Sequence, residues 1–321
     1  MTCTSPNKAW KRRGDGVIVF DEPSRSDLAF HYYEALELPC QQCLDCRLRR
    51  ASDWSLRIMH EASMHKCNCV VTLTYDEDHL PNRGMLNYRD VQLFIMRLRK
   101  AHPELRGALV YVCGCEYGKD GRPHYHIIFM GFDPSDKKEW SKSLGGTHLW
   151  LSDEVSELWR CGHVLVGELT KESADYVARY CVEKVTGERA KEYYRRVTDL
   201  DFGPPFVYWM PAECIRVSKG RAKPGEKTQF GRGIGARWLE RFWSDVFPAD
   251  HVVLRGGAEL KPPRYYDKLL KRRDAEAFEV VRAKREAEAL MPQRQADETP
   301  ERRSVRAQCT RARAAFKKRE L

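Results

Sequence analysis

The chain has 321 residues, of which 42% are hydrophobic, so it is long enough and apolar enough to build a buried core. The formal net charge of +10 favours an acidic partner, nucleic acid first and an anionic membrane surface second, although a solubility charge would give the same balance. No run approaches the roughly 20 apolar residues of a membrane-spanning helix, which excludes a protein with helical membrane spans. The N-terminus shows no apolar leader, and we therefore expect a cytosolic protein with reduced thiols.

The N-terminal segment, residues 1–66, is rich in cysteine and arginine. After an irregular stretch to residue 39, thiols recur at every third position, and clustered thiols in a reducing compartment favour metal binding over disulfides. Buried thiols without a metal are the alternative. The cluster is Cys40, Cys43 and Cys46, and Cys3, Cys67 or Cys69 can complete a structural zinc site.

A helix is expected from about residue 45 to residue 64, because apolar side chains there recur among arginines at helical spacing. We expect this helix to pack on the core and its arginines to contact DNA phosphates, with a solvated helix face as the alternative. The arginines are Arg47, Arg49, Arg50 and Arg57.

The central segment, residues 67–200, alternates strands and helices. Branched apolar residues predict a buried strand over 69–75. Apolar residues on one face predict an amphipathic helix over 88–100. A turn rich in glycine joins two further strands, over 108–117 and 124–130, into a hairpin.

A short helix over 153–159, a strand over 162–169 and a helix from Thr170 to about residue 185 complete this segment. A hairpin at the centre with helices around it predicts an α+β fold, in which a central antiparallel sheet carries flanking helices.

The C-terminal part divides into an extension of the same domain, 201–267, and a charged tail, 268–321. Glycine, proline and aromatic residues predict loops over 200–235, followed by a helix over 236–246. The tail holds 16 lysines and arginines against 9 acidic residues, a net charge of +7. We expect an exposed helix in its first half and disorder beyond Met291.

Two histidines share one face of the strand over 124–130. A strand alternates its faces with period two, so His124 and His126 point the same way, and Glu116 can lie beside them across the hairpin. Two imidazoles and one carboxylate leave coordination positions open, as a catalytic metal requires. A surface strand that happens to carry two histidines is the alternative.

Two tyrosines share one face of the helix after Thr170. Tyr176 and Tyr180 are four residues apart, and Lys184 follows four residues later beside that face. Tyrosine is a weak nucleophile at its ordinary pKa of about 10, and a nearby lysine or metal stabilises the phenolate for attack. Packing tyrosines show the same spacing, so the chemistry is indicated only by the combination with the histidine strand.

In order and spacing these motifs resemble those of the HUH endonucleases, and the likeness extends to the replication initiators of microviruses, especially the gokushovirus branch. It covers most of the chain from residue 3 to residue 269. The stretches that carry it are Val-Thr-Leu-Thr-Tyr75, Glu116, Pro-His-Tyr-His126 and Tyr-Val-Ala-Arg-Tyr180.

The resemblance implies a ferredoxin-like or RRM-like nuclease core and a rolling-circle initiator. In such proteins Mg²⁺ or Mn²⁺ sits on two histidines and a third polar ligand, which match His124, His126 and Glu116. One tyrosine attacks the origin strand, keeps its 5′ end as a phosphotyrosine ester and releases a 3′ hydroxyl primer. The second tyrosine allows a later transfer that frees a circle, and Tyr176 and Tyr180 match this pair.

The resemblance has one departure: the family often has lysine three residues after the second tyrosine, where this chain has Glu183. We keep Lys184 as the assisting base and assign Arg122 and Arg179 to DNA binding. The implied partners are single-stranded viral DNA, the double-stranded origin, and a host helicase, single-strand-binding protein and polymerase in the bacterial cytoplasm. Host unwinding is needed because the chain has no Gly-rich phosphate loop ending in Lys-Ser or Lys-Thr.

Two alternatives remain at the level of the sequence. A DNA-binding protein without catalysis would use the basic tail and structural metal sites. An HUH transposase or relaxase would use the same histidine and tyrosine residues on another DNA.

Overall fold

The computed structural model describes residues 3–29, 32–118, 120–142, 146–183, 188–198, 206–218, 233–254 and 256–317. The chain divides into two compact units. The smaller unit consists of residues 1–50 with 286–321, and the larger consists of residues 51–285. This division differs from the expected boundaries at 66, 200 and 267, because the N-terminal segment and the end of the tail belong to one unit.

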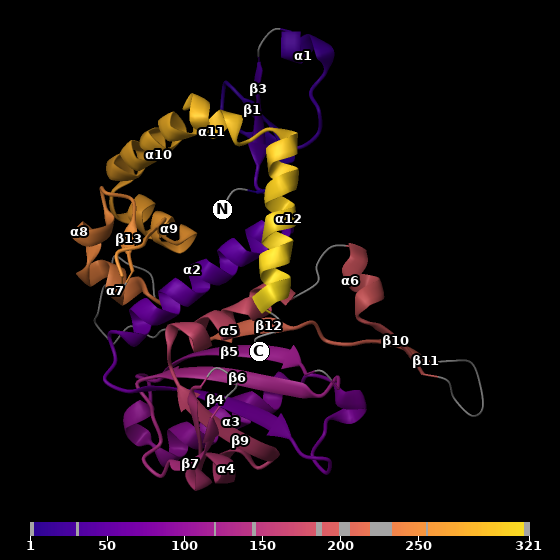
Figure 1. Ribbon diagram of the computed structural model, residues 1–321, viewed down its shortest axis with the longest axis vertical. Helices are drawn as coiled ribbons and strands as arrows, with labels where there is room; N and C mark the ends of the chain where they lie inside the picture. The colour runs from indigo at the N-terminus through magenta and orange to yellow at the C-terminus, as the bar shows by residue number, and fades with distance from the viewer. Residues whose placement is uncertain are drawn as a thin grey trace. The chain divides into compact units, whose positions relative to one another are not determined.

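The larger unit is built on a seven-stranded sheet in which every pairing is antiparallel, as Figure 1 shows. This sheet and its flanking helices confirm the expected α+β class. In order across the sheet the strands are β12 (Cys214–Val217), β5 (Val110–Tyr117), β6 (Pro123–Met130), β4 (Asn68–Tyr75), β9 (Gly162–Glu168), β8 (His148–Leu151) and β7 (Lys138–Lys142).

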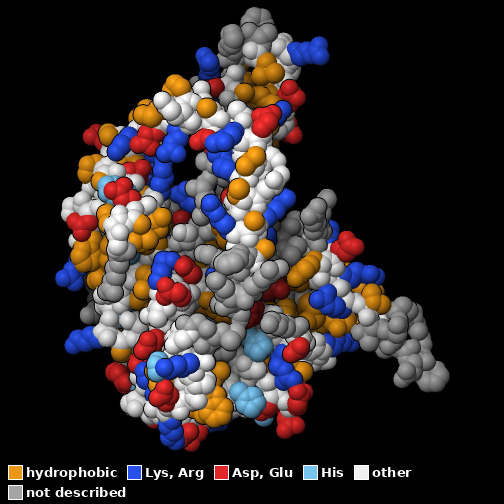
Figure 2. All heavy atoms as spheres, viewed as in Figure 1, with side chains coloured by type: hydrophobic (Ala, Val, Ile, Leu, Met, Phe, Trp, Pro, Cys, Tyr) orange, Lys and Arg blue, Asp and Glu red, His pale blue; other side chains and the backbone are white. Residues whose placement is uncertain are grey.

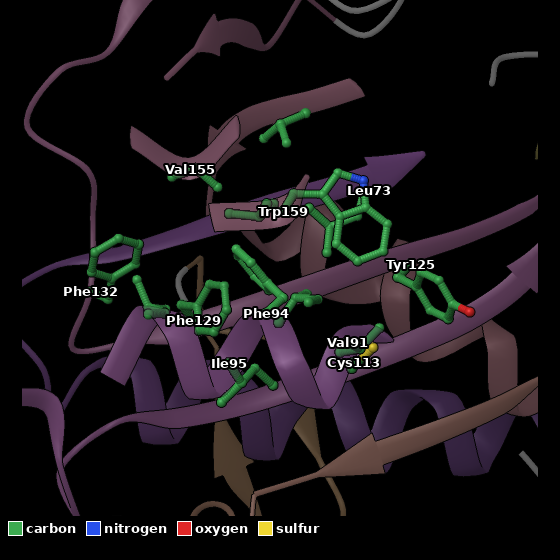
Figure 3. Close-up of a cluster of buried hydrophobic side chains, with 14 of the residues drawn as sticks. Leu73, Val91, Phe94, Ile95, Cys113, Tyr125, Phe129, Phe132, Val155 and Trp159 are labelled. Atoms are coloured by element: carbon green, nitrogen blue, oxygen red, sulfur yellow. The ribbon is translucent and has the colours of Figure 1, made fainter. Parts of the chain in front are cut away.

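One face of the sheet packs against α3 (Tyr88–Ala101) and α4 (Asp153–Trp159), with the short η2 (Pro103–Leu105) after α3. Figure 3 shows this core, in which Trp159 lies among rings from the strands and from α3. The alternation of β6 sends Tyr125 and every second residue after it into this layer, where Tyr125 is fully buried. The same alternation directs His124 and His126 to the opposite face.

The opposite face packs against α5 (Lys171–Glu183). Ala174 and Val177 are fully buried on that helix and share a core with Val112 and Ile128 of the central strands. The side of α5 that carries these residues faces the sheet. The helix therefore brings its tyrosines to the sheet face that carries the histidines.

Two strands lie where the composition predicted loops over 200–235, so that prediction is wrong for them. Phe-Val-Tyr-Trp and Cys-Ile-Arg-Val have the aromatic and branched residues that favour strands, which outweigh the surrounding glycine and proline. The second of these strands is β12 at the edge of the sheet. The first pairs outside the sheet, after α6 (Glu188–Tyr193), as a ribbon of β10 (Arg195–Thr198) and β11 (Phe206–Trp209).

The larger unit has a second core, which forms on the C-terminal half of α2 (Leu44–Ala62). The guanidinium of Arg57 lies 4.2 Å from the ring centroid of Trp54 and 4.1 Å from that of Tyr265, and donates a hydrogen bond of 3.0 Å to the carbonyl of Ile234. This packing contradicts the expected DNA contact of Arg57, because its donor group is turned inward. The other elements here are η1 (Asn82–Gly84), α7 (Ala236–Arg241), α8 (Trp243–Val246), β13 (Val252–Val253), β14 (Glu259–Leu260), α9 (Arg264–Arg273) and α10 (Ala275–Ala289).

The smaller unit is ordered at both ends of the chain. The disorder expected beyond Met291 is wrong for the described residues, since helices run to residue 317. Arg303 donates to Glu37 over 3.0 Å and Thr310 donates to Asp45 over 2.9 Å, so partners far away in the sequence hold the last helix. The elements are β1 (Asn7–Arg12), β2 (Ile18–Val19), α1 (Arg25–Ala29), β3 (Tyr33–Leu38), α11 (Pro292–Ala296) and α12 (Pro300–Lys317).

Among the described residues, no helix is long and apolar enough to cross a membrane.

Candidate functional site

The two histidines and Glu116 meet in the middle of the sheet. The hairpin register pairs Glu116 of β5 directly with His124 of β6. His126 lies two residues further along the same face, and its Nε2 is 2.8 Å from Glu116 Oε1. The structure thus brings together all three side chains expected to bind the catalytic metal.

The third strand of the site, β4, holds both imidazoles from the side opposite β5. Its register pairs Thr72 with His126 and Thr74 with His124. The two hydroxyls lie 2.9 and 3.0 Å from the Nδ1 atoms of these histidines. Because each Nδ1 is engaged by a threonine, the Nε2 atom of each ring is the one directed away from β4.

Sequence reasoning missed the two threonines. The available signal was their spacing, since Thr72 and Thr74 alternate within the predicted strand over 69–75 just as the histidines alternate within theirs. What the sequence does not state is that these two strands are neighbours.

His124 sits where a side chain on Gly118 would collide with it. A Cβ atom built on Gly118 would lie 2.6 Å from His124 Nε2, closer than real Cβ contacts. Burial, followed by the neighbouring His126, lowers the pKa of His124. A lowered pKa favours the neutral imidazole, which is the form that binds a metal.

The tyrosine helix reaches this cluster through Tyr176. Its hydroxyl donates to Glu116 Oε1 over 3.4 Å, and its ring lies edge-on to that of His126 at a centroid distance of 5.2 Å. Tyr180 lies on the same helix, but its side chain, like the whole of Lys184, is outside the described residues. The structure therefore joins one of the two tyrosines to the metal-ligand candidates.

The donors in this cluster fit a divalent ion that accepts imidazole and carboxylate. Their ligand atoms do not form a closed cage: in the described part of the chain, the only group of three or more Cys, His, Asp or Glu ligand atoms all within 4.8 Å of one another is a set of four cysteines. The direct hydrogen bond between His126 and Glu116 would be exchanged for coordination when an ion binds. An open site of this kind is expected for catalysis rather than for structure.

The four cysteines form a separate site in the smaller unit. Cys3 Sγ lies 3.6 Å from Cys40 Sγ and 3.7 Å from Cys43 Sγ, and Cys46 completes the set. Four sulfurs placed tetrahedrally about 2.3 Å from a zinc ion lie about 3.8 Å apart, so the spacing fits. The fourth member is Cys3; of the alternatives, Cys67 is exposed and Cys69 is buried in the core of the larger unit.

Backbone amides also point at these sulfurs. Cys40 N donates to Cys3 Sγ over 3.3 Å, and Gln42 N and Cys43 N donate to Cys40 Sγ over 3.4 and 3.2 Å. Amide donors of this kind stabilise negative charge on sulfur, which suits a thiolate ligand.

The remaining arginine candidates lie in different surroundings. Arg122 donates to the Tyr75 carbonyl over 2.9 Å and pairs with Glu77. In the smaller unit, Arg50 donates to the Gln41 carbonyl over 3.0 Å. The two others, both half-buried, are Arg47 and Arg179.

Comparison with known proteins places the chain among phage proteins. A family model for the replication-associated protein ORF2 matches residues 68–185, the stretch that holds the histidine strand and the tyrosine helix. No solved structure gives a match.

Three curated relatives extend the match. The replication-associated protein VP4 of Bdellovibrio phage phiMH2K is 30% identical over 290 residues, covering 88% of this chain and 82% of that protein. The replication-associated protein ORF2 of Spiroplasma virus 4 is 29% identical over 304 residues, covering 89% and 86%. The replication-associated protein ORF4 of Chlamydia phage 1 is 36% identical over 241 residues, covering 73% and 54%. The chain therefore belongs to the family of phage replication-associated proteins.

Proposed function

We propose that the protein initiates rolling-circle replication as a metal-dependent, site-specific endonuclease of single-stranded DNA, acting in the cytoplasm of a bacterial host. The main support is the contact of Tyr176 with both Glu116 and His126. A tyrosine hydroxyl beside a carboxylate and two imidazoles combines a nucleophile, a proton acceptor and metal ligands at one point on the sheet. The phage relatives, all named as replication-associated proteins, support the replication role.

His124, His126 and Glu116 would hold the ion, Mg²⁺ or Mn²⁺. Once bound, the ion would polarise the scissile phosphate and stabilise its developing charge. Thr72 and Thr74 would accept the Nδ1 protons and keep both rings neutral and oriented, as outer partners of metal-binding histidines commonly do.

In the proposed reaction the Tyr176 oxygen attacks the phosphorus, and its proton passes toward Glu116 Oε1. The bond from phosphorus to the 3′ oxygen breaks, the 3′ oxygen takes up a proton, and the 5′ end remains on the protein as a phosphotyrosine ester. The phosphodiester and its replacement are close in energy, so the step can be reversed for rejoining. Tyr180 would perform the second transfer, with Lys184 as the assisting base.

A covalent-adduct assay tests this function. The protein is incubated with labelled single-stranded origin oligonucleotides and Mn²⁺ and run on a denaturing gel. We expect a DNA-linked species that is lost in the Tyr176→Phe, Tyr180→Phe double variant, because phenylalanine has no attacking oxygen. Tight binding without any adduct would support a binding protein instead, and adducts confined to hairpin ends would support a transposase.

A second prediction concerns the threonines of β4. Thr72→Val and Thr74→Val keep the branched shape and remove the hydroxyl, so the partner imidazole loses its orientation. We expect each to raise the Mn²⁺ concentration needed for half-maximal adduct formation by about 10- to 100-fold. Thr72→Ser, which keeps the hydroxyl, is the matched control and should stay near wild type; equal metal requirements in all variants would contradict the role.

A further inference from the structure

The ribbon of β10 and β11, with the end of α6, exposes more apolar surface than its own packing needs. Tyr193, Val197, Phe206 and Trp209 are 52%, 49%, 43% and 58% exposed. A two-stranded ribbon on its own is marginally stable in water, and gathered exposed aromatics commonly mark an interaction site. Figure 2 shows hydrophobic and basic side chains intermixed over this part of the surface. We call Tyr193, Phe206, Tyr208 and Trp209 the aromatic ribbon.

The register of the ribbon places aromatic rings and arginines on both of its faces. Phe206 and Tyr208 share one face, where the guanidinium of Arg83 lies 4.2 and 4.7 Å from their ring centroids. Trp209 is on the other face, directly opposite exposed Arg195. Each face thus pairs a flat ring with a positive charge.

The Trp209 ring is held in place although it is exposed. Its Nε1 donates to the Lys191 carbonyl over 3.1 Å, and the next residue, Met210, donates its amide to the Tyr194 carbonyl over 2.8 Å. A ring that is oriented before binding loses little conformational freedom on stacking.

The aromatic ribbon is linked to the candidate active site through the sheet. From Trp209 the chain reaches Cys214 in five residues, a span of at most about 17 Å, and Cys214 pairs with Cys115, the neighbour of Glu116. Tyr117, on the other side of Glu116, donates its hydroxyl to the Pro211 carbonyl over 3.1 Å. A short stretch of single strand can therefore span both places.

We propose that the aromatic ribbon binds single-stranded DNA beside the scissile phosphate, with Trp209 stacking on a base and Arg83 and Arg195 facing phosphates. The choice of substrate rests on the proposed nicking function. Bases of a single strand expose their flat faces to such rings, whereas those of a duplex are stacked on one another. The positive charges on both ribbon faces fit a polyanion.

The test measures binding in the Tyr176→Phe, Tyr180→Phe background without added divalent metal, so that no cleavage occurs. Fluorescence anisotropy gives the Kd for a labelled single strand and for the matching duplex. Trp209→Leu keeps apolar bulk but loses the flat ring, and we expect it to weaken single-strand binding about fivefold to a hundredfold. Trp209→Phe should recover most of the affinity, and the duplex Kd should stay nearly unchanged.

Trp140 provides the matched control, since it is 64% exposed on β7 at the far edge of the same sheet. Trp140→Leu should leave the Kd unchanged, and melting curves should show that both leucine variants fold. Arg195→Gln should reduce the slope of log Kd against log salt by about 0.7, whereas Trp209→Leu should not change it.

Equal single-strand affinities in the wild-type ribbon and Trp209→Leu would overturn the proposal, as would equal losses from Trp209→Leu and Trp140→Leu. A change of oligomeric state in Trp209→Leu with unchanged DNA binding would assign the surface to a second copy of the chain and also overturn it. Because the readout is binding, it separates from the nicking test: an adduct-negative protein whose single-strand binding depends on Trp209 refutes only the nicking function.

Discussion

Replacing His126 with alanine is expected to abolish metal-dependent cleavage while leaving the fold and much of the DNA binding intact. The imidazole provides one of three candidate ligands, and Lewis-acid stabilisation of a phosphoryl transfer is worth several kcal/mol. We expect the rate of adduct formation to fall about a thousandfold or more, and His124→Ala to do the same. Single-turnover adduct formation at several Mn²⁺ concentrations measures the effect.

The fold should tolerate these changes because the two rings lie on the polar face of β6, away from the core around Tyr125. Circular dichroism and the melting temperature are the folding controls. His163→Ala is a matched variant: it removes an exposed histidine of β9 that pairs with Thr74 from the other side of β4. Full nicking activity in His124→Ala or His126→Ala would refute the metal assignment, and equal losses in His163→Ala would show a general effect of the sheet surface.

Local periodicity predicted the features of this site that depend on one hairpin or one helix. The period of a strand places His124 and His126 on one face, and the hairpin turn brings Glu116 opposite them. Tyr176 follows from helical spacing, because burial of Ala174 and Val177 turns that side of α5 to the sheet. These inferences need no knowledge of distant neighbours.

Features that depend on long-range pairing could not be predicted. Thr72 meets His126 only because β4 and β6 are adjacent, and 54 residues separate the two side chains. Arg57 has the same sequence pattern as the other arginines of its helix, yet it stacks on Tyr265, more than 200 residues away in the sequence. Charge at a helical position does not reveal whether the helix face is covered.

The two ends of the chain show the same limit from another side. High charge and low apolar content predicted a disordered tail, since such segments bury little surface of their own. Arg303 and Thr310 are instead held by Glu37 and Asp45. Partners supplied by the opposite end of the chain replace the missing core, and composition alone contains no information about them.

The second large effect is expected from the four cysteines. We propose that they bind one zinc ion per chain, and that removing it disorders the smaller unit, because the site ties Cys3 to the start of α2 and structural zinc sites contribute directly to folding. The free energy of binding in such sites is on the order of 10 kcal/mol or more, which exceeds what a small sheet such as β2-β1-β3 can supply alone.

Elemental analysis of protein purified without chelators measures the zinc, and hydrogen exchange measures the consequence. In Cys43→Ala we expect zinc content to fall below about a tenth of one ion per chain and amide protection to be lost across β1 and β3, while β4–β6 of the larger unit stay protected. Cys309→Ser, which changes an exposed thiol of the same unit, should keep both zinc and protection. Metal-free wild-type protein with full protection of β1 and β3 would show that the thiols pack without an ion and would contradict the zinc site.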